Sequence, residues 1–343
     1  MRPLPALLAA ALLAACAPRT TIVFEMPAEI AVPTTVQRLA VVDRKGSEAS
    51  AAARLALQEE LAAGARFRLA EPAAAQAALG KVQATVGAPL APSAAAEVRA
   101  AAGADGFVAV DQVEVVDVWT YAERLATRTR TEYRSPADCS TCAESAVEIT
   151  EEYPVIDATT TVTVTVGYQL YGADGAVLDA WTESLSDAST GTADATAGQE
   201  AARRAAAKPA ELAVELAEAT AFEAARHIAP WLATAERRWY ASGAPEVVAG
   251  ARLARDGDWT GAERAWRKGR KTAEGDGKGR VLFNLAVAAE RRGDIATALE
   301  LIKAAKDLLR QPKHADAYLV ELRDRKRQAR ALAAQLAPPP ADE

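Results

Sequence analysis

A long stretch of alternating apolar and polar residues, 113–185, constrains the fold of this 343-residue chain more than any other feature. Alternation favours β-strands, because successive side chains of a strand point to opposite faces. Over residues 124–134, a leucine, three threonines and a tyrosine share one side, while arginines and a glutamate occupy the other. The Gly-Ala-Asp-Gly sequence at 172–175 is typical of a hairpin turn. We predict an extended antiparallel ribbon with its tip at residues 135–143, followed by strands at 148–153, 159–171 and 177–185.

Shorter elements precede the ribbon and alternate in type. Strands are predicted at residues 39–43 and 66–70, and a further strand begins at Phe107 and leads into the ribbon. Helices are predicted from Ser47 to a C-terminal cap at Gly64, from Pro72 to near Gly80, and from a Ser93 cap to about residue 102. Such alternation favours an α/β layer. Residues 194–235 are predicted to be mainly helical.

The C-terminal third contains an internal repeat. The triplet Gly-Asp-Trp at 257–259 returns as Gly-Asp-Ile at 293–295, a period of 36 residues (293 − 257). The small residues around both triplets resemble those of tetratricopeptide repeats, closely over 279–312 and more loosely over 243–276. Two repeats are fewer than a stable array needs, so the preceding helix and residues 314–335 are expected to complete the stack. The predicted fold class is therefore α+β: an α/β domain with a ribbon, then an all-α repeat domain.

Four segments of the first part carry a further resemblance: 38–43 (RLAVVD), 67–70 (FRLA), 103–108 (GADGFV) and the strand-turn-strand at 162–181. Their order looks like the periplasmic α/β domain of curli-secretion-channel-like lipoproteins, which is similar to the N-terminal domain of the Tol-system propeller protein. Together with Trp231, 237–240 (RRWY) and 283–286 (FNLA), the chain also resembles a bacterial lipoprotein family of unassigned function. That family joins the same two parts.

The N-terminus has the features of an export signal. Arg2 precedes an uncharged apolar run that is too short to cross a bilayer, and the run ends in Leu-Ala-Ala-Cys at Cys16. This ending resembles the lipobox of bacterial lipoproteins, which implies cleavage before Cys16 and attachment of acyl chains such as palmitate. In that class an Asp after the cysteine favours inner-membrane retention; here Ala17 follows, so the resemblance implies the outer membrane with the body in the periplasm.

These observations give a map of the chain. It comprises a signal peptide (1–15), a lipidated tether (16–37), the α/β domain (38–193), connecting helices (194–235), the repeat domain (236–336) and a disordered tail (337–343). Charge supports a boundary near residue 236. Residues 16–235 carry 17 basic and 30 acidic side chains, whereas residues 236–336 carry 22 basic and 14 acidic ones. The basic region favours an acidic peptide segment, or the acidic N-terminal half of another copy, as partner rather than nucleic acid. A simply solvated helical face is the alternative.

Cysteines and catalytic motifs point away from an enzyme. Cys139 and Cys142 lie at the predicted ribbon tip, where a local disulfide is favoured in an oxidising compartment. A zinc site lacks further ligands, and a redox-active pair would need a helix N-terminus. The sequence contains no GxSxG, HExxH, phosphate-loop or dinucleotide fingerprint. We expect no catalytic residue, cofactor or metal.

One group in the second repeat is a candidate for partner binding. Asn284, the only asparagine of the chain, occupies a position that often faces the ligand groove of such repeats. Its neighbours in this candidate set are Arg280, Phe283, Val287 and Glu290. The alternative is an asparagine that bonds between helices.

The function favoured by these features is an outer-membrane-anchored periplasmic interaction or scaffold protein whose partner is a periplasmic or outer-membrane protein. Two alternatives stay open: a curli-channel-like oligomeric secretion pore and an envelope thiol oxidoreductase. The oligomeric state is also open.

Overall fold

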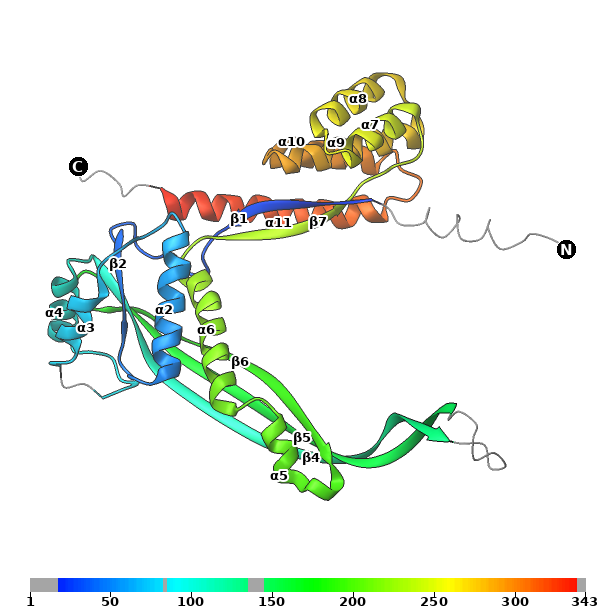
Figure 1. Ribbon diagram of the computed structural model, residues 1–343. Helices are drawn as coiled ribbons and strands as arrows, with labels where there is room; N and C mark the ends of the chain where they lie inside the picture. Colours follow the sequence, from blue (N-terminus) through cyan, green and yellow to red (C-terminus); the bar gives the residue numbers. More distant parts are fainter. Residues whose placement is uncertain (1–17, 83–84, 135–144, 338–343) are drawn as a thin grey trace. The chain divides into compact units, whose positions relative to one another are not determined.

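The computed structural model describes residues 18–82, 85–134 and 145–337, which form two compact units (Figure 1). We call Thr35–Ala229 the α/β unit. The helical unit consists of residues 18–34 together with residues 230–337. The described chain has a sheet-rich first part and an all-helical region from Pro245, which confirms the predicted α+β class.

The α/β unit is built on a five-stranded sheet of order β3-β2-β4-β5-β6. Its strands are β2 (Arg38–Asp43), β3 (Arg68–Leu69), β4 (Gly106–Arg134), β5 (Ser145–Tyr171) and β6 (Val177–Asp194). The strand β2 pairs in parallel with β3 and β4, whereas β4, β5 and β6 are antiparallel. The helices are α2 (Glu48–Ala63), α3 (Pro72–Leu79), α4 (Pro92–Ala102), α5 (Gly198–Ala205) and α6 (Pro209–Ile228).

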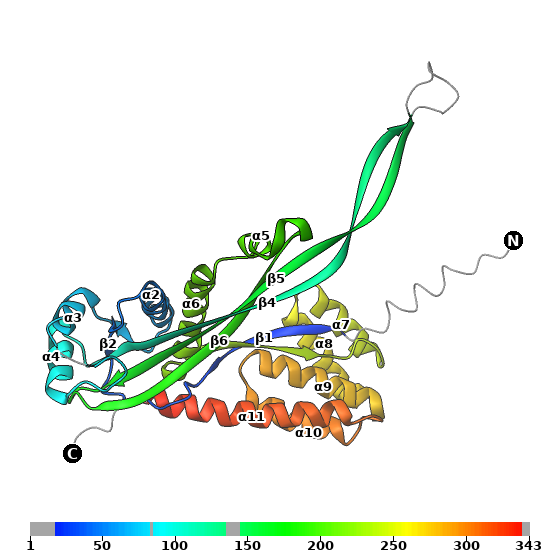
Figure 2. The same cartoon turned by 90° about the horizontal axis from the view of Figure 1, so that it is seen from below.

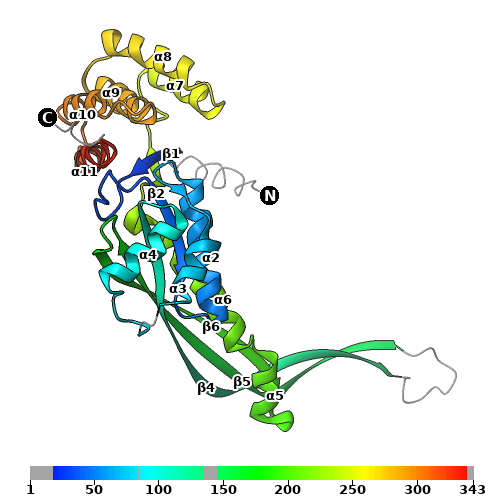
Figure 3. The same ribbon diagram turned by 90° about the vertical axis from the view of Figure 1, so that its left-hand side faces the viewer.

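Both faces of this sheet are covered at its broad end. Ala40, Val42 and Phe107 belong to a buried cluster with α3 and α4. The alternate residues, such as Leu39 and Val41, are also buried, and they point to the opposite face, which α2 and α6 cover (Figure 3). The short strands and helices predicted for residues 39–118 are all present. Ser47, the predicted start of the first helix, caps α2 through a capping box with Ser50. Ser93, predicted as a cap, lies instead inside α4, which begins at Pro92 after the N-cap Ala91.

The predicted ribbon is confirmed. The pairing of β4 with β5 runs from Phe107↔Tyr171 to Arg134↔Ser145, and β6 accompanies it only as far as Val155↔Asp194. Beyond that point β4 and β5 continue as a twisted two-stranded arm (Figure 2). Ion pairs join β4 and β5, Arg124 to Asp157 at 2.6 Å and Arg128 to Glu151, so these two arginines of the alternating pattern have carboxylate partners. The predicted tip lies outside the described residues.

In its described residues, the helical unit combines five helices with two strands. The helices are α7 (Pro245–Arg255), α8 (Trp259–Thr272), α9 (Gly275–Arg291), α10 (Ile295–Lys306) and α11 (Lys313–Leu336). The repeated triplet makes the same turn twice: Gly257 and Gly293 have φ of 84° and 80°, and the following aspartates cap α8 and α10. A left-handed backbone explains glycine at both positions. The repeat therefore corresponds to two helix pairs, α7–α8 and α9–α10.

A tryptophan holds the first pair together. Trp266 of α8 is fully buried, and its indole N–H donates to the Val247 carbonyl of α7 at 3.4 Å. Gly250 leaves the space for this ring, because a Cβ there would lie 2.2 Å from its nitrogen. Small residues at the repeat positions thus admit a large side chain from the neighbouring helix.

The predicted boundaries need three corrections. Within the tether expected over 16–37, residues Arg19–Met26 form β1, which pairs antiparallel with β7 (Trp231–Arg238). The connecting segment 194–235 therefore contains part of a strand besides its helices. The helix expected to extend the repeat stack, α6, packs instead against α2 in the α/β unit. The helical stack begins at Pro245, after the strand.

The N-terminal strand follows a hydrophobic pattern that the tether interpretation missed. Ile22 is almost fully buried in the helical unit, and Phe24 packs against the same core. These residues alternate with exposed ones, as in a half-buried strand. No helix in the described ranges, 18–82, 85–134 and 145–337, is long and apolar enough to cross a bilayer.

Candidate functional site

Three predicted site residues, Cys16, Cys139 and Cys142, lie outside the described residues. Among the residues that the structure describes, no cluster of three or more His, Cys, Asp or Glu side chains could hold a metal ion. The predicted partner-binding set, in contrast, lies wholly within the described helical unit.

Asn284 is fully buried and bonds to the chain segment that enters the helical stack. Its Oδ1 accepts from the Tyr240 amide at 2.7 Å, and its Nδ2 donates to the Tyr240 carbonyl at 2.8 Å. Both backbone groups of Tyr240 are thereby satisfied by one side chain. Asn284 fixes the connection after β7 to α9 and does not face a groove. The alternative interpretation, an internal bond, matches this placement, although the partner is a connecting segment rather than a helix.

Glu290 is also internal, and it forms a buried charged network. Two guanidinium nitrogens of Arg237 donate to its two carboxylate oxygens at 2.8 and 3.0 Å, and the Tyr318 hydroxyl donates at 2.6 Å. The Glu290 side chain is fully buried and that of Arg237 is 10% exposed. Burial raises the pKa of Tyr318 well above its usual value, and the Glu290 charge raises it further, so the phenol keeps its proton. This network joins β7, α9 and α11.

The remaining members of the predicted set serve the same internal purpose. Phe283 and Val287 are buried, and Phe283 packs edge-to-face on Tyr240. Arg280 is partly exposed, but its side chain is held by Asp276 at 2.8 Å and by the Ser242 carbonyl at 3.0 Å. The five residues predicted to contact a partner thus lie mostly in the interior of the unit, because strand β7 and α11 cover the face of α9 that was expected to be open.

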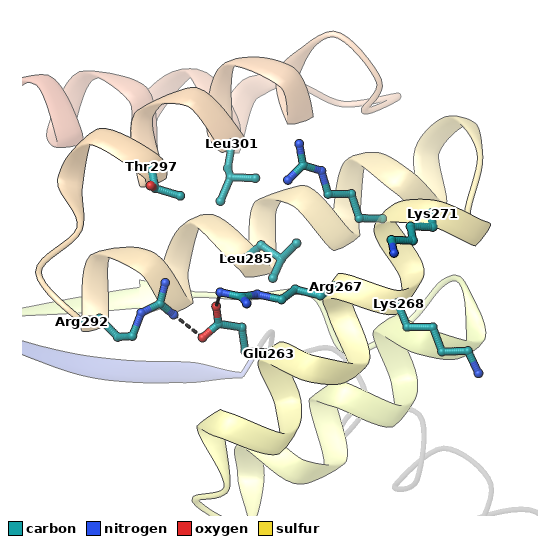
Figure 4. Close-up of a pocket in the computed structure, with 9 residues that line it drawn as sticks. Glu263, Arg267, Lys268, Lys271, Leu285, Arg292, Thr297 and Leu301 are labelled. Carbon is teal, nitrogen blue, oxygen red and sulfur yellow. Dashed lines mark hydrogen bonds and ion pairs between the residues drawn. The ribbon is translucent and has the colours of Figure 1, made fainter.

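A different part of the same repeats is open. A groove of about 700 Å³ runs between α8, α9 and α10 (Figure 4). Leu301 is partly exposed in it, Leu285 lines it from the buried core, and Thr297 adds a hydroxyl. Five cationic side chains line it: Arg267, Lys268, Arg270, Lys271 and Arg292.

The groove has one carboxylate, and that carboxylate is already engaged. Glu263 pairs with Arg267 at 2.6 Å and also with Arg292, so it lies between the two guanidinium groups (Figure 4). Within the described chain, Arg270 and Lys271 make no ion pair. The groove therefore carries a net charge of +4, from five cations and one carboxylate.

A second hollow continues the groove toward α11. It measures about 380 Å³ and shares Arg270, Thr297 and Leu301 with the first. Two further lysines line it, Lys303 and Lys326, and Lys303 pairs with Glu300 at 3.1 Å. The basic groove, by which we mean the two hollows together, thus extends over four helices of the unit.

The sequence predicted a basic region, but the candidate residues chosen from it lie on a covered face of α9 and do not line the groove. The run 264–271 (RAWRKGRK) was the available signal, because its cations follow the helix around the buried Trp266. Positions 267, 270 and 271 lie on one face of α8, so three of the cationic side chains lie together beside α9. Chemically, this arrangement offers anion recognition: fixed cations beside an apolar surface.

Comparisons with known proteins add little to this geometry. A family model described as Domain of unknown function (DUF6340) matches residues 248–326, which fall within α7–α11. Among solved structures, the chain is similar to the PelC dodecamer from Paraburkholderia phytofirmans, with 14% identity over 61% of this chain and 99% of that chain and a TM-score of 0.21. A single-substitution variant of that dodecamer gives 16% identity, 59% and 96% coverage, and the same TM-score. No curated protein matches the chain.

Proposed function

We propose that this protein is a lipid-anchored interaction module of the outer membrane that faces the periplasm and has no catalytic activity of its own. Its basic groove binds an acidic, partly apolar segment of another envelope protein. The observation that carries the proposal is the composition of the larger hollow of this groove: five cations beside leucine side chains, with a single carboxylate, Glu263, that two arginines already share.

The positive charge of the groove favours a negatively charged ligand. Arg270 and Lys271 have no ion pair within the described residues, so carboxylates of a partner would supply opposite charges without displacing an internal partner. Exposed complementary charges mainly raise the association rate and the specificity, and their effect weakens with salt. Binding through this groove is therefore expected to depend strongly on ionic strength.

The lining leucines further restrict the class of ligand that fits the groove. Leu301 is partly exposed and lines both hollows, whereas the other lining leucines, Leu282, Leu285 and Leu299, belong to the buried core, so the exposed apolar surface of the groove centres on Leu301. A purely acidic segment would leave this surface in contact with water. An amphipathic segment, with carboxylates on one side and apolar side chains on the other, fits both features.

The anchor part of the proposal comes from the sequence. Leu-Ala-Ala-Cys at Cys16 resembles a lipobox, and Ala17 follows it. Two or more acyl chains hold a protein stably at a bilayer, where one chain is marginal. A binding module held in this way meets its partners at the membrane surface.

The test uses the purified full-length chain and a synthetic amphipathic peptide with glutamate on one helical face and leucine on the other. Binding is measured by fluorescence anisotropy at low and high salt. The groove variant is Arg270→Gln with Lys271→Gln. The matched control is Arg310→Gln with Lys313→Gln, an equal change of charge at exposed positions that do not line the groove.

We expect the groove variant to weaken binding by about tenfold at low salt, as the loss of two complementary charges would. The control should bind as the unmodified chain does, and high salt should reduce the difference between the two. Equal affinity of the groove variant and the control, or binding that is insensitive to salt, would refute the groove as the binding site.

A further inference from the structure

Two arginines lie opposite each other at the start of the N-terminal strand. Arg19, the first residue of β1, is the direct cross-strand partner of Arg238, the last residue of β7. Both side chains are exposed, so they share the outer face of the two-stranded ribbon. Like charges directly opposite in an antiparallel pair are unfavourable. Arg19 is compensated by Glu236 at 2.7 Å, whereas Arg238 makes no ion pair in the described part of the chain.

The position of this pair relative to Cys16 is set by chain length. Three residues separate the positions (19 − 16), and three extended residues span at most about 10–11 Å. The inference therefore rests on the lipid anchor of the proposed function: if Cys16 is acylated, the start of β1 stays within that distance of the bilayer surface. Headgroup layers add about 5–8 Å to each side of the hydrocarbon core, so the guanidinium groups can reach lipid phosphates.

Further from Cys16, the outer face of β1 and β7 carries no second pair of cations. Its next pairs are Thr21 with Glu236, Val23 with Thr234, and Glu25 with Leu232. The arginine pair is thus confined to one end of the face, and Glu25 lies about 20 Å further along the strand. The start of β1 is also fixed to the helical unit, because the Trp239 amide donates to the Pro18 carbonyl at 3.1 Å. The cations therefore have a defined place next to the anchor.

We propose that Arg19 and Arg238 bind the phosphates of anionic lipid headgroups and so orient the helical unit on the membrane that holds its acyl chains. A guanidinium group offers several N–H donors in a plane and suits a phosphate. Two guanidinium groups on adjacent strands can contact one headgroup or two neighbouring ones. The headgroup relieves the repulsion that the pairing imposes.

The test places the full-length acylated chain in vesicles of phosphatidylcholine alone or with about one-third phosphatidylglycerol. A fluorophore is attached at Thr21→Cys or at Glu25→Cys, in a chain with Cys139→Ser and Cys142→Ser, and is quenched by a headgroup-labelled lipid. Both positions lie on the outer face of β1. The variant is Arg19→Gln with Arg238→Gln, and the charge-matched control is Arg252→Gln with Arg264→Gln, which are exposed on α7 and α8.

We expect at least about twofold stronger quenching at position 21 than at position 25, with a difference that grows when phosphatidylglycerol is present. The Arg19/Arg238 variant should lose this growth, and the control should keep it. Equal quenching at both positions, or an unchanged lipid response in the variant, would overturn the inference while leaving the anchor intact. A chain that does not float with vesicles at all would refute the anchor, and the inference with it; peptide binding by the basic groove is measured separately.

Discussion

Replacing Glu290 by glutamine tests whether this residue belongs to the core, as the structure places it, or to a binding surface, as the sequence indicated. The substitution keeps the shape and removes the charge that faces Arg237, whose side chain is only 10% exposed. Removing one partner of a buried ion pair costs about 3–5 kcal/mol. Arg237 keeps a second partner at 2.7 Å, the half-exposed carboxylate of Glu321. We therefore expect the free energy of unfolding of the helical unit to fall by about 2–4 kcal/mol.

The two units need not unfold in one step, so the assay must report on the helical unit alone. Hydrogen exchange followed by mass spectrometry does this, because peptides from α9 and α11 are read apart from those of β4 and β5. In Glu290→Gln, the free energy of opening in α9 and α11 should fall by the stated amount, and exchange in β4 and β5 should stay unchanged. Glu321→Gln, the exposed control, should cost less than about 1 kcal/mol.

The refuting result is equally specific. If Glu290→Gln opens α9 no more easily than Glu321→Gln does, the buried network is not what stabilises the unit. If the variant instead loses peptide binding with its stability intact, Glu290 contacts the ligand, and the groove assignment is wrong.

Two further predictions concern packing and charge. Gly250→Ala should destabilise the helical unit by about 1–3 kcal/mol, because the added Cβ would meet the Trp266 ring. Hydrogen exchange in α7 and α8 should become faster. Unchanged protection of these helices would contradict the close packing. The pKa of Asp157 should lie below its usual value, because the Arg124 hydrogen bond and then that of Thr192 favour the carboxylate. The stabilisation of the fold by the Asp157 carboxylate should be lost as the pH falls through this lowered pKa. In Arg124→Gln, an NMR titration should show a higher Asp157 pKa than in the unmodified chain. An unchanged Asp157 pKa would contradict the pairing.

Local patterns were enough to predict most of the α/β unit. The alternation in residues 113–185 predicted the ribbon, and Ser47 and Gly64 marked the two ends of α2, because helix caps depend on a few neighbouring residues. Strand β1 was missed because its partner, β7, lies more than 200 residues away, and an isolated eight-residue strand has no neighbour to reveal it.

The site was harder to predict for a related reason. Repeat position suggested that Asn284 and Glu290 were exposed, but β7 and α11 cover that face, and neither belongs to a repeat pair. Sequence periodicity places residues on helix faces; it does not show which face another segment covers. The net positive charge of residues 236–336 correctly indicated a basic region, whereas the gathering of Arg267, Arg270 and Lys271 beside Leu285 required the packing of α8 on α9.

The most direct test of the central claim is site-specific photocrosslinking in native envelopes. A photoreactive amino acid replaces Thr297, which lines both hollows of the groove, or Arg310, which lines neither. We predict that position 297 crosslinks to a segment rich in Asp and Glu with interspersed apolar residues and that position 310 does not. Arg270→Gln with Lys271→Gln should reduce the product at position 297. Crosslinks to a basic or uncharged segment, or equal products from both positions, would contradict the account.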